Sequence, residues 1–310
     1  MEEETVKRAK RSAAVVLIYA RWVALGTLLL LCAAPSVRVA MPRPMPRGFG
    51  VAIGYGLGGA TELDRLGSVW YVDYDYRGAV LDRHPRLFLV ESRADLKPAA
   101  AVARIHPGEW WQFGNEPNDP NQDNISPTEY ARRYREFYFL LKRADPSARI
   151  VVAGIADADW KWAEEFRSSY RAQFGRYPHR DGWSIHNYLL DRCADATDAE
   201  KVKSRVVAFR DWMTRIGEAS QPLLLSEYGV LYGNGCCECP LIAPEVTVAF
   251  MQTTTRWLFQ SRLTQGWAWF SVRSGGRFNG DLFTDQGQVT EYGRAYQGLF
   301  AGLVDGLQSP

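Results

Sequence analysis

The sequence of 310 residues predicts an α/β fold: a single (β/α)8 TIM barrel preceded by an N-terminal signal or anchor segment. Short apolar runs alternate with helical stretches along the chain, which is typical of parallel strands connected by helices. Eight such runs occur, and this number favours a closed barrel over an open sheet. The body of the chain, residues 48–310, has about the length of one such barrel and is long for two independent domains.

The N-terminal residues 1–40 have the pattern of a signal peptide or a signal anchor. An apolar block from Ala13 to Ala34, which Arg21 interrupts once, follows the basic residues Lys7, Arg8, Lys10 and Arg11. The uninterrupted part, residues 22–34, is shorter than the about 20 residues that span a bilayer, and residues 37–40 form an imperfect cleavage site. We therefore expect a secreted or membrane-anchored, extracytoplasmic protein. Cleavage and retention as a membrane tether both stay open, and a buried core helix is the disfavoured alternative.

A proline-rich linker, residues 41–47, separates two parts of opposite charge. The linker is expected to be extended and semi-rigid because it contains Pro42, Pro44 and Pro46. Of the overall charge of +2, residues 1–47 hold eight basic and three acidic residues, a net +5, which leaves −3 for the domain at 48–310. An acidic body disfavours nucleic acid as a partner. We interpret its densest basic group as a solvated helix face, formed by Arg132, Arg133 and Arg135.

The eight apolar runs are the predicted strands, and each is nearly uniformly apolar, as expected for strands buried on both faces. In order they cover residues 49–53, 68–74, 86–90, 109–113, 150–153, 182–186, 222–225 and 266–270. Two of the segments between them carry clear helix signals. A capping box from Ser126 to Glu129 predicts a helix that ends at Asp145. Apolar residues at helical spacing predict another helix from Val202 to Ile216.

Two glutamates stand out among the polar residues that follow the predicted strands. Glu116 closes the fourth strand in Trp110-Trp-Gln-Phe-Gly-Asn-Glu-Pro117, and Glu227 closes the seventh in Leu223-Leu-Leu-Ser-Glu-Tyr-Gly229. In an eight-strand barrel these ends face each other across the C-terminal mouth, where chemistry takes place. A carboxylate pair suits the cleavage of glycosidic bonds. A separation of about 5 to 5.5 Å implies retention at the anomeric carbon, and one of about 6.5 to 9.5 Å implies inversion, so both courses stay open.

The motifs at these strand ends resemble a known family. Asn-Glu-Pro at Glu116, Glu-Tyr-Gly at Glu227, His-x-Tyr on the sixth strand and Trp-x-Trp on the eighth are similar to glycoside hydrolase clan A, whose members are retaining (β/α)8-barrel glycosidases. The opening Gly48-Phe-Gly-Val-Ala and the segment Val69-Trp-Tyr-Val-Asp-Tyr74 resemble the small β-1,3-glucanase barrels of family 128. This resemblance implies that residues 48–310 form a glycoside hydrolase-like catalytic domain.

The resemblance also implies roles for individual residues. Glu116 would be the acid/base and Glu227 the nucleophile. Asn115 would bind the sugar 2-hydroxyl, and Tyr188 would hold Glu227 ionised by a hydrogen bond that lowers its pKa.

Other residues are expected at the sugar. Trp269, or Trp267 if the register shifts by two, would form an apolar platform under it. The remaining substrate-binding candidates are His186, which could also be a buried barrel histidine, Trp70 and Asp73. One departure from the clan concerns the arginine that braces the nucleophile near the end of strand two, where the sequence offers only Arg77.

Four cysteines of the body are disulfide candidates, because disulfides are common in exported domains. Cys193 follows the sixth strand, and Cys236, Cys237 and Cys239 follow the seventh. A zinc site made of the four thiolates is the alternative, although the C-C-x-C spacing differs from the usual C-x2-C pairs. Apart from this alternative, we expect neither a metal nor a cofactor.

The sequence therefore predicts a retaining glycoside hydrolase that acts on a β-linked poly- or oligosaccharide, with a β-glucan-like substrate favoured. The first alternative is a non-catalytic carbohydrate-binding barrel. The second is an NAD-dependent oxidoreductase, because Gly54-Tyr-Gly-Leu-Gly-Gly59 matches a dinucleotide-binding fingerprint and Asp73 follows it. Residues 60–66 are too few for the usual crossover helix, so we interpret these glycines as a loop at the barrel mouth.

Overall fold

The computed structural model describes residues 43–53, 59–77, 84–232, 239–276 and 278–305. The predicted leader and most of the glycine fingerprint lie outside these residues. No described helix combines the length and the apolar character that crossing a bilayer requires.

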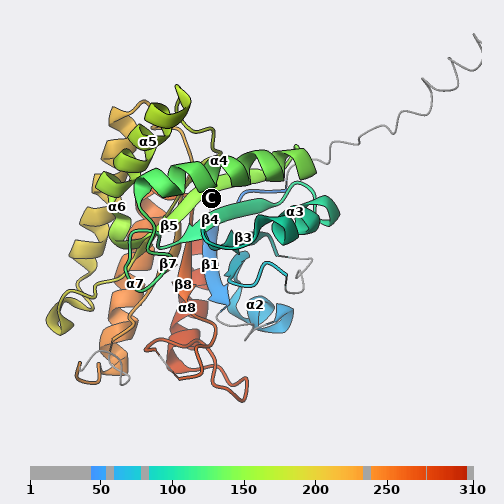
Figure 1. Cartoon of the computed structure of the whole chain (residues 1–310). Helices are drawn as coiled ribbons and strands as arrows, with labels where there is room; N and C mark the ends of the chain where they lie inside the picture. The colour runs from blue at the N-terminus through green and yellow to red at the C-terminus, as the bar shows by residue number, and fades with distance from the viewer. Residues whose placement is uncertain (1–42, 54–58, 78–83, 233–238, 277, 306–310) are drawn as a thin grey trace, which may run out of the picture. The chain divides into compact units, whose positions relative to one another are not determined.

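Eight parallel strands close into a barrel in sequence order, β1 to β8, as predicted (Figure 1). They are β1 Gly48–Ile53, β2 Trp70–Asp73, β3 Arg86–Val90, β4 Trp110–Asn115, β5 Arg149–Ile155, β6 Gly182–Asn187, β7 Leu223–Tyr228 and β8 Gly266–Phe270. Each of the eight predicted strands is present: β3 and β8 have the predicted bounds, β2 is shorter, and the other five are shifted or lengthened by a few residues. The closed sheet differs from the open, doubly wound sheet in which a G-x-G-x-x-G fingerprint binds a dinucleotide, so the observation behind the oxidoreductase alternative loses its structural context.

Helices follow the strands and cover the outside of the barrel (Figure 1). They are α2 Ala60–Leu66, α3 Leu96–Ile105, α4 Pro127–Ala144, α5 Trp160–Phe174, α6 Ala199–Arg215, α7 Pro244–Ser261 and α8 Glu291–Asp305, with two 3-10 turns at Ala156–Ala158 and Cys193–Asp195. The two helices with clear sequence signals are confirmed. The hydroxyl of Ser126 caps α4 by accepting a hydrogen bond from the Glu129 amide, and Asp145 ends that helix.

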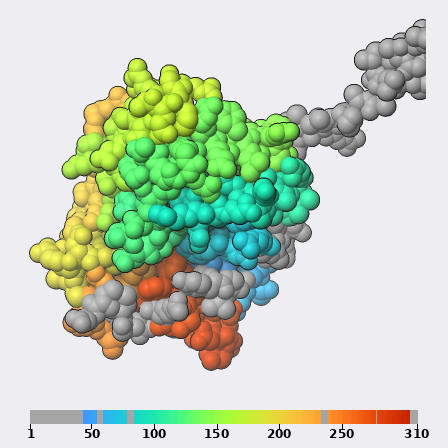
Figure 2. Space-filling model, in the orientation of Figure 1, coloured from blue at the N-terminus to red at the C-terminus, as the bar shows by residue number. Residues whose placement is uncertain are grey.

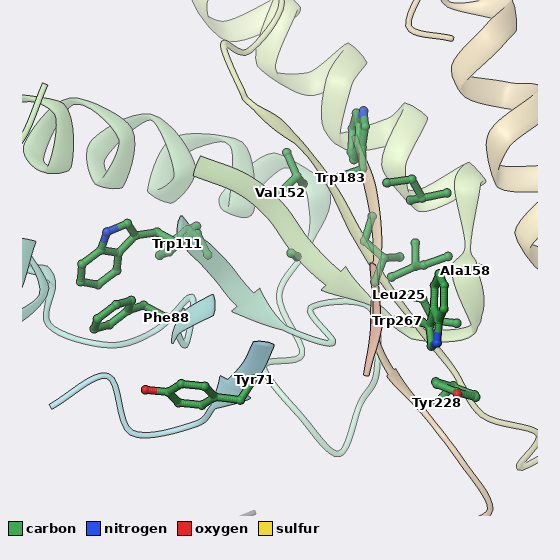
Figure 3. Close-up of a cluster of buried hydrophobic side chains, with 14 of the residues drawn as sticks. Tyr71, Phe88, Trp111, Val152, Ala158, Trp183, Leu225, Tyr228 and Trp267 are labelled. Atoms are coloured by element: carbon green, nitrogen blue, oxygen red, sulfur yellow. The ribbon is translucent and has the colours of Figure 1, made fainter. Parts of the chain in front are cut away.

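The alternation of side chains along the strands creates two apolar layers. One fills the barrel and includes Trp70, Leu87 and Phe270. The other lies between the strands and the helices and contains Phe88, Trp111 and Trp267. Figure 3 shows part of this outer layer, in which the rings of Phe88 and Trp111 stack with centroids 4.5 Å apart. Which of the two layers a side chain joins decides whether it can reach the barrel mouth.

Candidate active site

Glu116 and Glu227 meet at the C-terminal mouth of the barrel, as the strand order predicts. A carboxylate oxygen of one lies within 4.8 Å of a carboxylate oxygen of the other. Both side chains line a cavity of about 200 Å³ together with Asn115 and Tyr188. Their side chains are only 12% and 7% exposed, so the two acids are close together and largely removed from water.

Irregular backbone aims both acids into the mouth. Glu116, just after β4, has a φ of +47°, in the left-handed region that residues other than glycine rarely adopt. Its amide donates a hydrogen bond to the carbonyl of Gly154 at 2.9 Å. Strained residues of this kind cluster at functional sites, where the surrounding contacts hold them in place.

A β-bulge in β7 orients Glu227. Ile185 pairs with Leu225, but the next residue of β6, His186, pairs with Glu227, so Ser226 is the extra residue. Ser226 lies inside the barrel, where its hydroxyl donates to Gln112 at 3.0 Å. Strict two-residue alternation would then turn Glu227 outward. The bulge shifts the register by one residue and directs Glu227 into the barrel mouth.

His186 lies between the two carboxylates. Its Nδ1 is 3.0 Å from Oε1 of Glu116, and its Nε2 is 3.2 Å from Oε1 of Glu227. The imidazole is fully buried, and although burial lowers its pKa, the charges of Glu227 and Glu116 outweigh this effect and raise the pKa above the ordinary value. His186 is not among the residues that line the cavity. Its place is therefore beneath the two acids rather than against the sugar.

The three residues also offer metal-ligating atoms within 4.8 Å of one another. Nδ1 of His186 forms a hydrogen bond with Glu116. Its Nε2 faces Oε1 of Glu227 at 3.2 Å, and neither of these two buried atoms has a hydrogen-bond partner among the described residues. One hydrogen bond and the attraction of the two carboxylates for the imidazole therefore hold the three groups together.

Two tyrosine hydroxyls act on Glu227. The hydroxyl of Tyr188 donates to Oε2 of Glu227 at 2.8 Å, which is the contact expected from the sequence. Tyr74 directly follows β2, and its hydroxyl lowers the pKa of Glu227. Burial raises the pKa of Glu227 and the nearby Glu116 carboxylate adds to this, whereas His186 and the two hydroxyls lower it. The net direction is upward, so the expectation that Tyr188 would leave Glu227 with a low pKa is wrong: burial outweighs the hydrogen bonds.

Asn115 lines the same cavity, beside Glu116. Its backbone amide donates to the buried carboxylate of Asp123 at 2.9 Å, and that carboxylate also accepts from the hydroxyl and the amide of Ser92. The side-chain amide of Asn115 donates to Gln122 at 3.2 Å, while its Oδ1 is buried and accepts no hydrogen bond from the described residues. Asn115 is thus fixed in place with one acceptor left for a ligand.

The two tryptophans of β8 do not face the mouth, which corrects the expected sugar platform. Trp269 lies in the outer layer, where its indole nitrogen donates to the Gly280 carbonyl at 2.8 Å and its ring packs edge-on against Tyr228. Trp267 packs in the same layer against Phe49. By alternation the inward residues of β8 are Ala268 and Phe270, and it is Phe270 that lines the cavity.

Trp70 and Asp73 are likewise not at the cavity. Trp70 points into the barrel, but it is fully buried and its indole nitrogen donates to the Gly48 carbonyl at 3.0 Å. Asp73 points the other way and accepts a hydrogen bond from the buried guanidinium of Arg86 at 3.1 Å. Both residues therefore have structural roles.

At the end of β2, the residue that acts on Glu227 is a tyrosine rather than an arginine. Arg77 is exposed, with its guanidinium over the ring of Tyr76, 5.2 Å from the centroid. The hydroxyl of Tyr74 lowers the pKa of Glu227 there.

Six cavity-lining residues are absent from the sequence-based set: Tyr74, Glu91, Gln122, Leu231, Phe270 and Phe278. Tyr74 and Phe270 occupy positions whose side chains face the barrel interior by the two-residue alternation of a strand, so this alternation could have identified them. Glu91 directly follows β3, so its position at a strand end could have indicated it. The other three lie further along the segments after strands, where a single sequence carries no comparable signal.

Cys193 and Cys239 form a disulfide with Cα atoms 5.5 Å apart, which is one of the pairings that the sequence leaves open. It joins the segment after β6, which carries Tyr188, to the segment after β7, which carries Leu231. The bond removes two of the four thiolates that the zinc alternative requires. Cys236 and Cys237 lie outside the described residues.

Two buried, facing carboxylates at the C-terminal mouth of a parallel barrel are the arrangement that glycoside hydrolysis on this fold requires. The chain belongs to the glycosyl hydrolase catalytic core family, whose model matches residues 93–296. No curated protein matches the chain.

Solved structures of family 128 glycoside hydrolases share this fold. A subgroup I endo-β-1,3-glucanase from Amycolatopsis mediterranei, in complex with laminaritriose, is 19% identical over 82% of this chain and 99% of that chain, with a TM-score of 0.63. A subgroup II endo-β-1,3-glucanase from Sorangium cellulosum is 18% identical over 81% and 98%, with a TM-score of 0.62. A subgroup III curdlan-specific exo-β-1,3-glucanase from Blastomyces gilchristii, in complex with glucose, is 15% identical over 81% and 97%, with a TM-score of 0.60.

Proposed function

We propose that this glycoside hydrolase cleaves β-1,3-linked glucan with retention at the anomeric carbon. The observation that carries the proposal is the spacing of Glu116 and Glu227, whose oxygens come within 4.8 Å. Retaining enzymes separate their two carboxyl groups by about 5 to 5.5 Å, and inverting enzymes leave room for a water molecule between them. The short spacing favours direct attack by one carboxylate.

The contacts of the two acids support their roles. Glu227 is the nucleophile, because the hydroxyls of Tyr188 and Tyr74 favour its ionised form against the effect of burial. Glu116 lies within hydrogen-bonding distance of Nδ1 of His186, 3.0 Å away, and is the acid. Glu227 attacks the anomeric carbon while Glu116 protonates the leaving oxygen, and the glycosidic bond breaks. Glu116 then takes a proton from water, the water oxygen displaces Glu227 from the sugar, and both acids return to their starting states.

The substrate class rests on the relatives and on the cavity walls. The three related structures are named as β-1,3-glucanases, two of them endo-acting. In this chain Phe270, Phe278 and Leu231 supply apolar surface beside the acids. Apolar side chains of this kind pack against the C–H faces of a glucosyl ring, and Asn115 offers its free acceptor to a hydroxyl.

We also propose that the protein acts outside the cytoplasm, secreted or held at the membrane by residues 1–40. The disulfide between Cys193 and Cys239 supports this, because such bonds persist in oxidising compartments. Thiol counting on the protein from an exporting host, with and without reductant, tests the proposal. Two additional thiols after reduction are expected, and fully reduced Cys193 and Cys239 in the exported protein would contradict it.

Laminarin hydrolysis followed by proton NMR tests the proposed function. The β-anomer should form first, and the activity should be lost in both Glu116→Gln and Glu227→Gln. A 2-fluoro glucoside should add one sugar mass to Glu227. Initial release of the α-anomer would overturn retention, and labelling of another residue would overturn the assignment of the nucleophile. Binding of laminarin without turnover on any β-glucan would favour the carbohydrate-binding barrel.

A further inference from the structure

A groove on the flank of the barrel lies apart from the active site. It has a volume of about 540 Å³ and is lined by residues of α4 and by the last residue of α5, Phe174. These two helices lie side by side at the surface, α4 in green and α5 in yellow-green in Figure 2. The groove extends to Arg143 in the last turn of α4. Because helices of this fold run back from the C-terminal mouth, that end of the groove lies toward the opposite face from Glu116 and Glu227.

Aromatic rings and guanidinium groups alternate in the groove. Phe139 is 43% exposed, although it is a large apolar side chain. The guanidinium carbon of Arg135 lies 5.0 Å from the ring centroid of Phe139 and 4.5 Å from that of Phe174. Arg135 is thus held between two rings, which orders its side chain and leaves ring surface open beside a fixed positive charge.

The positive charge of the groove is only partly neutralised. Arg132 pairs with Glu129 at 2.6 Å, and Glu136, which also lines the groove, pairs with Arg133 at 2.9 Å. No carboxylate of the described residues pairs with Arg135 or Arg143. Residues 48–310 carry a net charge of −3. The two unpaired arginines therefore make the groove locally positive on a domain that is negative overall.

We propose that this groove binds an anionic polysaccharide, of which a polyuronate is the simplest form. Arginine forks pair with sugar carboxylates, and exposed phenyl rings pack against the C–H faces of the same sugars. A concave groove fits a single chain better than it fits a bilayer surface, which is the competing anionic partner. The groove would hold the glucanase on an acidic component of a mixed glycan matrix while the mouth of the barrel acts on neutral glucan. This binding does not depend on the proposed reaction.

Affinity electrophoresis of the full chain in gels with polygalacturonate tests the proposal. The unaltered protein should be retarded at low salt and released at high salt. Arg135→Gln with Arg143→Gln should weaken binding by about tenfold or more, since both charge-assisted contacts to the sugar carboxylates are lost. Phe139→Ala should weaken it without a change in charge. Hydrolysis of a short soluble β-1,3-glucan should be unchanged in these variants, which separates this site from the active site.

The matched control is Arg104→Gln with Arg256→Gln, which removes two exposed arginines of α3 and α7 and leaves the groove intact. This control should bind polygalacturonate like the unaltered protein. Absence of retardation, or equal weakening in the control, would overturn the proposal, because the first shows no site and the second only a general effect of charge. Loss of binding to phosphatidylglycerol vesicles in the Arg135/Arg143 variant, with polygalacturonate binding intact, would also overturn it and assign the groove to a membrane surface.

Discussion

Gly154 of β5 leaves open the space that the imidazole of His186 occupies on β6. A Cβ atom at position 154 would overlap Nε2 of the ring and lie 2.6 Å from Cε1. The same glycine accepts the hydrogen bond that fixes the backbone of Glu116. A residue without a side chain thus supports both Glu116 and the histidine that lies between Glu116 and Glu227. Its role comes from the space it leaves rather than from any chemistry of its own.

We expect Gly154→Ala to displace His186 and to reduce activity by about tenfold or more, with a loss of roughly 1 to 3 kcal/mol in stability from overpacking. Enzyme kinetics and denaturant unfolding measure the two effects. Gly298→Ala is the matched control, because Gly298 lies in α8 with nothing within 4 Å of an added Cβ. The control should leave activity unchanged and stability equal or slightly higher. Full activity in Gly154→Ala would show that His186 need not hold its position.

The two tyrosines on Glu227 predict a change in pH dependence. Each hydroxyl lowers the pKa of Glu227, so Tyr188→Phe and Tyr74→Phe should each raise that pKa. Because the proposed nucleophile, Glu227, must be ionised to attack, the acid limb of kcat/KM against pH should move to higher pH, and the double variant should move further. The maximal rate should fall by about tenfold or more in each, since the lost hydrogen bond is to a charged group.

Tyr228→Phe is the control for this pH shift. Its hydroxyl contacts Thr255 at 2.8 Å in the outer layer and is remote from the acids. The acid limb of this variant should coincide with that of the unaltered protein. An acid limb that stays in place in both Tyr188→Phe and Tyr74→Phe would mean that the limb reports a group other than Glu227.

The aromatic residues of β8 give a prediction about substrate binding. Phe270→Ala should lower kcat/KM on β-1,3-glucan by about 10-fold, because part of an apolar wall worth on the order of 1 to 2 kcal/mol is lost. Trp269→Phe should reduce thermal stability, since the indole hydrogen bond to Gly280 is broken, but leave KM unchanged. A raised KM in Trp269→Phe with no effect in Phe270→Ala would restore the tryptophan as the platform.

The sequence does not predict that Phe270 lines the cavity while Trp269 packs in the outer layer, although it predicts much of the rest of the site. The strands are predictable because buried parallel strands are uniformly apolar, and Glu116 and Glu227 are predictable because barrel chemistry lies at strand ends. In a uniformly apolar strand, however, the sequence does not show which side chains face the barrel interior and which face the helices. A shift of one residue exchanges the two layers, so Trp269 could not be told from Phe270 by pattern alone.

Most features of the site that the sequence does not predict depend on local backbone geometry. The bulge at Ser226 and the left-handed Glu116 leave no periodic signal, yet they decide where both acids point. Tyr188 was predictable because the His-x-Tyr motif fixes its distance from β6. The direction in which the pKa of Glu227 shifts was not predictable. Burial raises this pKa and hydrogen bonds lower it, and the extent of burial is a property of the assembled barrel.

Burial of Glu227 predicts a conflict between stability and activity. A carboxyl group whose pKa is raised in the folded state contributes stability below its unfolded pKa and loses it as the pH rises through the folded pKa. Ionised Glu227 therefore costs folding free energy at neutral pH. Glu227→Gln removes this charge, so the inactive variant should be more stable than the unaltered protein at pH 7, by roughly 1 kcal/mol or about 2 to 4 °C in Tm.

The gain should shrink at about pH 3, because there Glu227 is almost fully protonated in both the folded and the unfolded state and the substitution removes little charge. Thermal unfolding of both proteins across this pH range measures the difference. Glu200→Gln, whose side chain is 81% exposed, should give no such pH-dependent gain. A Tm of Glu227→Gln that falls at pH 7, or a gain of equal size at both pH values, would mean that the hydrogen bonds from Tyr74 and Tyr188 outweigh the burial of the charge.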